Sequence, residues 1–106
     1  MKIAVVILNW NGAKLLQQFL PSIIQFSDNA TIYVADNASS DTSIEVLKTE
    51  FPSIKIIENA GNYGFAKGYN EALKCVEEPY YALVNSDIEV TENWLQPIET
   101  IFDNEP

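Results

Sequence analysis

Four short apolar runs recur along the chain, and a stretch with helical spacing separates each run from the next. We predict strands at residues 2–8, 31–35, 54–57 and 80–84. Runs without polar alternation are typical of parallel strands that are covered on both faces. Strands that alternate with helices form right-handed crossovers. The sequence therefore predicts an α/β fold with an open, mainly parallel sheet and helices on both faces.

The helical stretches each carry apolar side chains on one face. In the first stretch, residues 15–24, Pro21 should kink or break the helix because proline lacks an N–H group. Residues 42–45, Thr-Ser-Ile-Glu, fit a capping box that begins the second helix. A third helical stripe runs over residues 65–76, and a last one over residues 91–102. These stretches supply the helices that the fold prediction requires.

The 106 residues suffice for one domain, and no apolar run reaches the roughly 20 residues that a membrane-spanning helix needs. The first residues lack the length and cleavage site of a signal peptide. We therefore expect a cytoplasmic protein, which in full length can sit peripherally at the cytoplasmic face of the membrane. Cys75, the single cysteine, is expected to be a small core residue.

The chain is acidic, with 15 Asp and Glu against 6 Lys and Arg and no His, giving a net charge of −9. Such a surface disfavours binding to a nucleic-acid backbone. Without His, a metal would be held by oxygen atoms, which favours magnesium, manganese or calcium. A divalent cation would also offset the repulsion between this surface and a phosphate ligand.

A short side chain with an oxygen atom follows each predicted strand. These residues are Asn9, Asp36, Asn59 and Asn85. Each alone is a common turn former. Open parallel sheets bind ligands at the carboxyl ends of their strands, so the coincidence of all four favours a ligand site there.

The segment 85–89, Asn-Ser-Asp-Ile-Glu, follows the last predicted strand and places Asp87 at the same edge. A carboxylate there can coordinate one divalent ion while diphosphate oxygens fill other positions. Asn85 can add a carbonyl ligand or a hydrogen bond. The alternative is a turn and a helix cap before Thr91. The chain has no GKS or GKT triplet, which excludes a P-loop.

Four motifs in this chain resemble family 2 glycosyltransferases of the rhamnosyltransferase-like type. They occur in the family's order and cover nearly the whole chain. The motifs are VVILNWNG at residues 5–12, VADNASSD at 34–41, N with NYGFAKGYN at 59 and 62–70, and LVNSD at 83–87.

The resemblance implies a GT-A fold and inverting transfer of a sugar from a nucleotide-diphosphate donor. By position, Asn9, Trp10 and Asn11 would line the base and ribose pocket, and Asp36 would bind the nucleotide. The same carry-over implies Mg or Mn at Asp87. The remaining implied donor contacts are Asn62, Gly64, Phe65, Lys67, Asn70 and Asn85.

This chain departs from the family pattern in two ways. Ser86 takes the middle place of the metal motif, where the family has other residues. The family's acceptor-binding half and its carboxylate base would also lie beyond residue 106. We therefore expect residues 1–106 to be a truncated donor-binding domain that alone transfers no sugar, with the catalytic base elsewhere. The expected partners are the nucleotide sugar and a glycan or lipid-linked acceptor of polysaccharide assembly. An exposed sheet edge would favour self-association.

Three other classes compete with this interpretation. A nucleotidyltransferase would have a glycine-rich basic loop after the first strand, whereas residues 9–14 contain one Gly and no Arg. A receiver domain would have an acidic pair there, and Asn9 and Asn11 are neutral. A non-catalytic nucleotide-binding or interaction module remains open.

Overall fold

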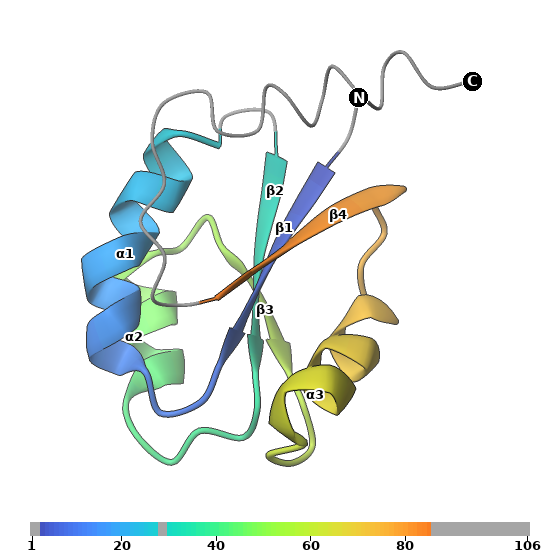
Figure 1. The fold of residues 1–106 in the computed structure, drawn as a ribbon. Helices are drawn as coiled ribbons and strands as arrows, with labels where there is room; N and C mark the ends of the chain where they lie inside the picture. The colour runs from blue at the N-terminus through green and yellow to red at the C-terminus, as the bar shows by residue number, and fades with distance from the viewer. Residues whose placement is uncertain (1–2, 28–29, 86–106) are drawn as a thin grey trace.

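The computed structural model describes residues 3–27 and 30–85, apart from the side chains of Phe65 and Asn85. Its four strands form one parallel sheet in the order β3-β2-β1-β4 (Figure 1). The strand bounds are Ile3–Asn9 for β1, Ala30–Asp36 for β2, Lys55–Glu58 for β3 and Tyr80–Asn85 for β4. Each strand lies within two residues of its predicted position, because the apolar runs are long enough to fill the pleated surface of a sheet.

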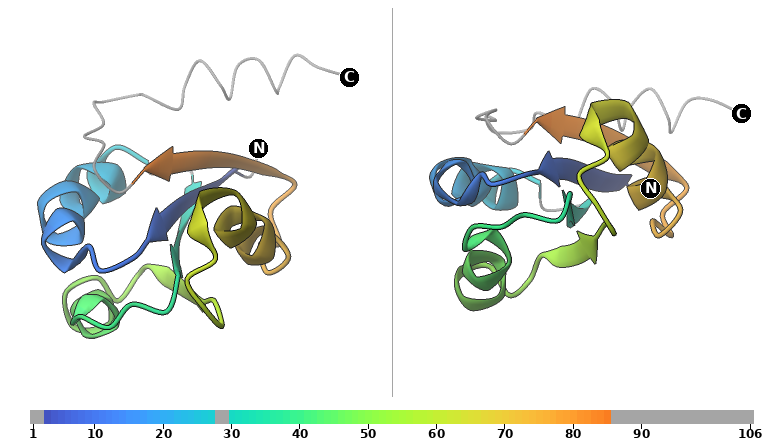
Figure 2. Two further views of the ribbon diagram at one scale, coloured as in Figure 1. Left: turned by 60° about the horizontal axis from the view of Figure 1, so that its bottom comes forward. Right: turned by 90° about the horizontal axis from the view of Figure 1, so that it is seen from below.

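Helices cover both faces of the sheet, as predicted (Figure 2). Helix α1, Ala13–Gln25, and helix α2, Ser43–Glu50, lie on one face. Helix α3, Gly64–Leu73, lies on the other face. The connections through α1 and α2 each join neighbouring parallel strands, and the connection through α3 crosses from β3 to β4 at the other end of the sheet, which gives the predicted open α/β architecture.

Alternate residues of β1 enter two different hydrophobic cores. Val5 and Ile7 pack with apolar residues of α1 and α2. Ala4 and Val6 pack with Tyr69 and other apolar residues of α3. Side chains alternate across a strand, so one continuous apolar run fills both layers. β1 is thus an inner strand of the described sheet, both by its sequence pattern and by its position.

Helix α1 continues through Pro21, so the helix does not break there, and a kink at Pro21 stays a prediction. Proline removes only one backbone donor of the helix, and Pro21 lies on the exposed side. The opposite side is anchored by Leu20 and Ile23, each 1% exposed. This burial outweighs the missing hydrogen bond.

The predicted capping box at α2 is also wrong. Thr42 occupies the N-cap position but makes no side-chain capping hydrogen bond. The N–H of Ser43 instead donates to Oδ1 of Asp41 at 2.9 Å. An aspartate one residue before Thr42 therefore satisfies the first backbone donor of the helix.

Helix α3 ends at Leu73, two residues before Cys75. Cys75 is exposed, so the prediction of a core position is wrong. Its helical spacing would place it on the apolar face only if the helix continued, and it does not. The predicted last helix, residues 91–102, lies outside the described residues. Within the described ranges, no helix is long and apolar enough to cross a membrane.

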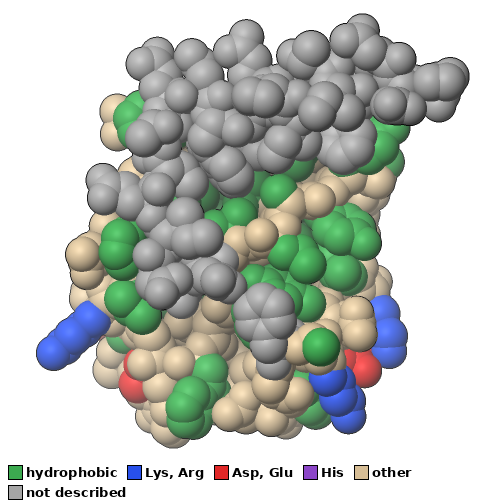
Figure 3. Space-filling view, in the orientation of Figure 1, with side chains coloured by type: hydrophobic (Ala, Val, Ile, Leu, Met, Phe, Trp, Pro, Cys, Tyr) green, Lys and Arg blue, Asp and Glu red, His purple; other side chains and the backbone are tan. Residues whose placement is uncertain are grey.

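Strand β4 is an edge of the sheet as far as residues 3–27 and 30–85 define it. Its side chains Tyr80, Tyr81 and Leu83 are 38%, 50% and 47% exposed. Figure 3 shows hydrophobic side chains gathered on this side of the molecule. Self-association through such an edge stays a prediction.

Candidate functional site

The polar residues that follow the strands meet at one edge of the sheet. Asn9 pairs in register with Asp36, which pairs with Glu58, and Asn59 follows directly. On the other side of β1, Leu8 pairs with Asn85. The parallel registers thus place all four predicted strand-end residues along the carboxyl edge.

Asn9 and Asp36 are joined through their side chains. Nδ2 of Asn9 donates to Oδ1 of Asp36 at 2.9 Å. The hydroxyl of Ser39 donates to the same oxygen at 2.7 Å, and its backbone N–H donates to Oδ2 at 2.8 Å. Asp36 is only 2% exposed. Its carboxylate therefore organises the loops around the edge, and direct contact with a nucleotide stays a prediction.

The β1–α1 and β2–α2 loops are locked together by Asn11. Oδ1 of Asn11 accepts hydrogen bonds from the N–H groups of Ser40 at 2.7 Å and Asp41 at 3.2 Å. The N–H of Asn11 donates to Oγ of Ser39 at 2.9 Å. Asn11 has a φ of 51°, a left-handed conformation that asparagine tolerates better than most residues. Its amide is thus committed to shaping the loop.

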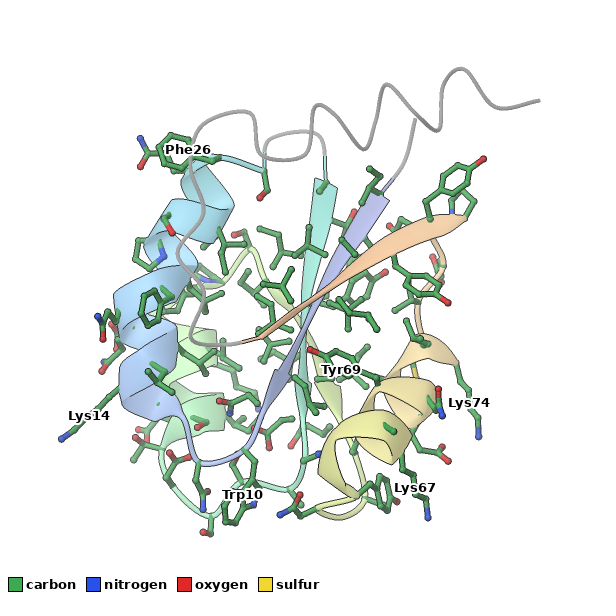
Figure 4. All side chains as sticks on the ribbon, in the orientation of Figure 1. Trp10, Lys14, Phe26, Lys67, Tyr69 and Lys74 are labelled. Atoms are coloured by element: carbon green, nitrogen blue, oxygen red, sulfur yellow. The ribbon has the colours of Figure 1, made fainter. Side chains whose placement is uncertain are left out.

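Trp10 lies between these two anchored residues. It is 54% exposed, and Figure 4 shows it beyond the end of β1. Asn9 and Asn11 hold the backbone on either side of it by the hydrogen bonds described above. An exposed indole on a fixed loop can offer its ring to a flat ligand such as a nucleotide base at a low entropic cost.

Asn37 and Asn59 hold the first half of α3 against the same edge. Nδ2 of Asn59 donates to Oδ1 of Asn37 at 2.7 Å and to the carbonyl of Gly68 at 3.2 Å. Nδ2 of Asn37 donates to the carbonyl of Gly64 at 3.1 Å. A Cβ on Gly68 would lie 2.7 Å from Nδ2 of Asn37, so glycine is required for this close approach.

The predicted donor contacts around the start of α3 are exposed. Asn62 accepts a hydrogen bond from the N–H of Gly64 at 3.3 Å, and Gly64 has a φ of +75°. The ammonium of Lys67 lies 4.6 Å from the ring centre of Tyr63, a cation–π contact. Asn70 is also exposed. Figure 4 shows Lys67 on α3 toward the same end of the molecule as Trp10.

Oδ1 of Asn9 is buried and finds no hydrogen-bond partner among the described residues. A Cβ on Gly12 would approach this oxygen to 2.6 Å. The oxygen therefore faces the backbone of the next loop rather than solvent. Asn9, 1% exposed, acts from beneath the site surface.

Asp41 joins the starts of both helices on this side. Its Oδ2 accepts the N–H of Ala13 at 3.2 Å, and its Oδ1 accepts hydrogen bonds from Ser43. Burial raises the pKa of Asp41, but the hydrogen bonds from Ser43 and Ala13 lower it by more. The net pKa therefore lies below the ordinary value, and the carboxylate is charged at neutral pH.

A cavity of about 440 Å³ opens between the starts of α1 and α2. It is lined in part by Asn11, Lys14 and Asp41. Asn11, which is predicted to line the base and ribose pocket, is the predicted site residue among those that line this cavity. Its volume suits a small molecule.

Asp87, the predicted metal ligand, and the side chains of Asn85 and Phe65 lie outside what the structure describes. Among the described residues, no group of three or more His, Cys, Asp or Glu is placed to hold a metal ion.

Sequence reasoning missed several residues that build this edge: Gly12, Asn37, Ser39, Ser40, Asp41, Gly68 and Tyr69. Ser39 carried a usable signal, since an aspartate followed three residues later by serine often closes a local turn. Asn37 and Gly68 lie in the motifs at residues 34–41 and 62–70, but their contact was not predictable because it depends on how α3 packs on the sheet.

Solved glycosyltransferases share this fold. The mannosyltransferase PcManGT from Pyrobaculum calidifontis, in complex with GDP-Man and Mn²⁺, is similar over 98% of this chain with a TM-score of 0.81 and 19% identity. TarS 1-349 from S. aureus, in complex with UDP-GlcNAc, is similar over 97% with a TM-score of 0.83 and 23% identity. The arrangement of sheet and helices is therefore that of a GT-A glycosyltransferase.

The sequence itself defines the family more narrowly. Residues 4–106 match the profile described as Glycosyl transferase family 2. The chain belongs to this family. It spans only about a third of the solved structures above, 32% of PcManGT and 31% of TarS 1-349. A search among curated proteins finds no match.

Proposed function

We propose that this chain binds the nucleotide-diphosphate sugar of an inverting glycosyltransferase at the carboxyl edge of its sheet. The observation that carries the proposal is the set of hydrogen bonds made by Asn9, Asp36 and Asn11 at the carboxyl edge. These bonds fix the loop that carries the exposed Trp10. Rigid loops at the ends of parallel strands are where α/β sheets bind ligands. Support also comes from two similar structures, which hold GDP-Man with Mn²⁺ and UDP-GlcNAc.

Each part of the edge has its own role in this proposal. Trp10 stacks on the base, while the polar groups of Asn11 and Asp36 orient the nucleoside directly or through the loop. Asn62, Gly64 and Phe65 shape the cleft near the diphosphate. Lys67 and Asn70, on the first turns of α3, meet phosphate or sugar oxygens.

A magnesium or manganese ion fits the residues that the chain offers. The chain has no Arg and a net charge of −9, so a diphosphate needs a cation to offset repulsion. Magnesium is commonly bound through one or two carboxylates plus substrate phosphates. Asp87 supplies such a carboxylate, and Asn85 supplies a further oxygen. When bound, the ion would neutralise the charge that develops on the departing diphosphate.

The chain supplies the leaving-group side of the reaction. An acceptor hydroxyl loses its proton to a base outside residues 1–106 and attacks the anomeric carbon opposite the diphosphate. The edge residues hold the nucleotide still, which lowers the entropic cost of that attack. We propose a glycan or lipid-linked acceptor, at the cytoplasmic face of the membrane, in polysaccharide assembly. By itself the 106-residue chain transfers no sugar.

Calorimetry on the full-length protein tests this function. UDP, dTDP and GDP are titrated with and without Mn²⁺, and we expect at least one to bind about tenfold tighter with the metal. Asp87→Asn should remove that gain. Glu58→Gln is the matched control, because Glu58 is an exposed carboxylate at the end of β3 and should leave the gain unchanged.

Two results would count against the proposal. One is the absence of binding by all three nucleotides to the full-length protein. The other is binding that neither Mn²⁺ nor Asp87→Asn alters. Nucleotide binding without any sugar transfer would favour the alternative, a non-catalytic nucleotide-binding module.

A further inference from the structure

Tyr69 extends from α3 to the contact between β1 and β4 (Figure 4). Its hydroxyl donates to the carbonyl of Val84 at 2.9 Å and accepts from the N–H of Leu8 at 3.4 Å. The side chain is 3% exposed, and its ring packs in the core on the α3 face. A single side-chain oxygen atom from α3 therefore contacts both β1 and β4.

The two backbone groups that Tyr69 contacts form a matched pair in the sheet. Leu8 is in register with Asn85, and Val84 is the residue before Asn85. In a regular parallel ladder, every other N–H donates to the carbonyl that precedes its partner. For Leu8 that carbonyl belongs to Val84. The hydroxyl thus contacts one backbone group on each strand, at the residue before Asn9 on β1 and at the residue before Asn85 on β4.

The position of this contact links three parts of the proposed donor site. Leu8 directly precedes Asn9 and the Trp10 loop. Val84 lies three residues before Asp87 in the sequence. Tyr69 itself lies next to Gly68, whose carbonyl and close packing are held by Asn59 and Asn37. A change in this one contact would shift the nucleotide loop relative to the strand that leads to Asp87.

We propose that Tyr69 is a positioning residue, whose hydroxyl fixes the end of β4 against β1 and α3 so that nucleotide contacts and the metal ligand meet the same diphosphate. This inference rests on the proposed donor site and goes beyond it, since it assigns a role to a side chain whose hydroxyl contacts the backbones of β1 and β4. Burial raises the pKa of Tyr69, so the hydroxyl remains protonated and able to donate at neutral pH.

The test separates positioning from simple stability. Tyr69→Phe keeps the buried ring and removes only the oxygen. Tyr33→Phe is the matched control: Tyr33 is 4% exposed on the same face, and its hydroxyl donates at 2.7 Å to Glu78, which lies in the connection between α3 and the amino end of β4. For the full-length protein and both variants, the affinity for UDP or GDP is measured with and without Mn²⁺.

We expect Tyr69→Phe to lower the gain in affinity from Mn²⁺ by about three- to tenfold, the effect of one or two hydrogen bonds. The metal-free affinity should change little. In Tyr33→Phe both quantities should stay as in the unmodified protein. If the Tyr69 hydroxyl only stabilised the fold, Tyr69→Phe would lower the nucleotide affinity with Mn²⁺ and without it together, in step with a lower unfolding midpoint.

The proposal is overturned if Mn²⁺ raises the nucleotide affinity of the unmodified protein and raises that of Tyr69→Phe by the same factor. If the unmodified protein shows no Mn²⁺ gain, the donor-site proposal fails and this inference with it. If Tyr69→Phe does not fold, the rate of amide hydrogen exchange at Leu8 in the unmodified protein tests the proposal instead. Nucleotide and Mn²⁺ together should slow that exchange at least about threefold, and no change would contradict the proposal.

Discussion

The side chain of Asn9 donates a hydrogen bond to the carboxylate of Asp36 over 2.9 Å and so joins the ends of β1 and β2. The backbones of the two strands already pair in register at these residues. Because both side chains are almost fully buried, the bond is shielded from water. The rigidity of the Trp10 loop depends on this link.

Replacing Asp36 by asparagine should destabilise the fold. An amide nitrogen at either Oδ position would face donors of Asn9 or Ser39, which leaves buried donors unsatisfied. We expect the free energy of unfolding to fall by about 1–3 kcal/mol, measured by urea denaturation. Glu58→Gln, the exposed register partner of Asp36 on β3, should change it by less than about 0.5 kcal/mol. Equal effects would contradict the structural role of Asp36.

Gly68→Ala should also destabilise, although alanine favours a helix by about 1 kcal/mol over glycine. The added Cβ would lie 2.7 Å from Nδ2 of Asn37 and 2.9 Å from Cδ1 of Leu8. We expect a net loss of about 1–3 kcal/mol in urea unfolding. Asn70→Ala, an exposed change in the same helix, should cause no loss. A stabilised Gly68→Ala would show that α3 does not pack this closely.

Asp41→Ala should cost about 1 kcal/mol at neutral pH, because Asp41 caps α2 and accepts the N–H of Ala13. The folded-state pKa of Asp41 is below its ordinary 3.8. The carboxylate therefore contributes its full stability above that value and loses it as the pH falls through the folded pKa. The difference in unfolding free energy between Asp41→Ala and the unmodified protein should shrink below about pH 4. A difference that is constant down to pH 2 would contradict this.

Tyr33 should make the fold sensitive to alkali. Burial and the neighbouring Glu78 raise its pKa from 10.0 to about 12. The folded state therefore holds the proton more tightly, so stability is complete below pH 10 and falls as the pH rises from 10 to 12. Tyr33→Phe should make the decline in unfolding free energy over this range less steep. An unchanged slope would show that the Tyr33 hydroxyl is not held in the folded state.

The sequence predicts the layers of this fold well because each strand is a dense apolar run. Val5 and Val6 are both buried, one on each face, which a fully covered central strand requires. The carboxyl edge follows from the same logic, since parallel strands end together. Asn9 and Asp36 are therefore predictable as neighbours.

The finer structure depends on contacts between distant residues. Pro21 does not end its helix because Leu20 and Ile23 are buried against the sheet. Asp41, rather than Thr42, caps α2, a choice that depends on how the loop is held by Asn11. The bridging role of Tyr69 requires the strand order to be known. Local patterns carry none of this information.

Paramagnetic broadening by Mn²⁺ tests the central claim most directly. With a bound nucleotide diphosphate, the metal should broaden the backbone amide signals of Asn9, Trp10 and Ser39 at the carboxyl edge of the full-length protein. Signals of Ile3 and Thr31, at the opposite ends of β1 and β2, should stay sharp. Broadening centred on Ile3 and Thr31, or none at the carboxyl edge at saturating nucleotide, would contradict a donor site at this edge.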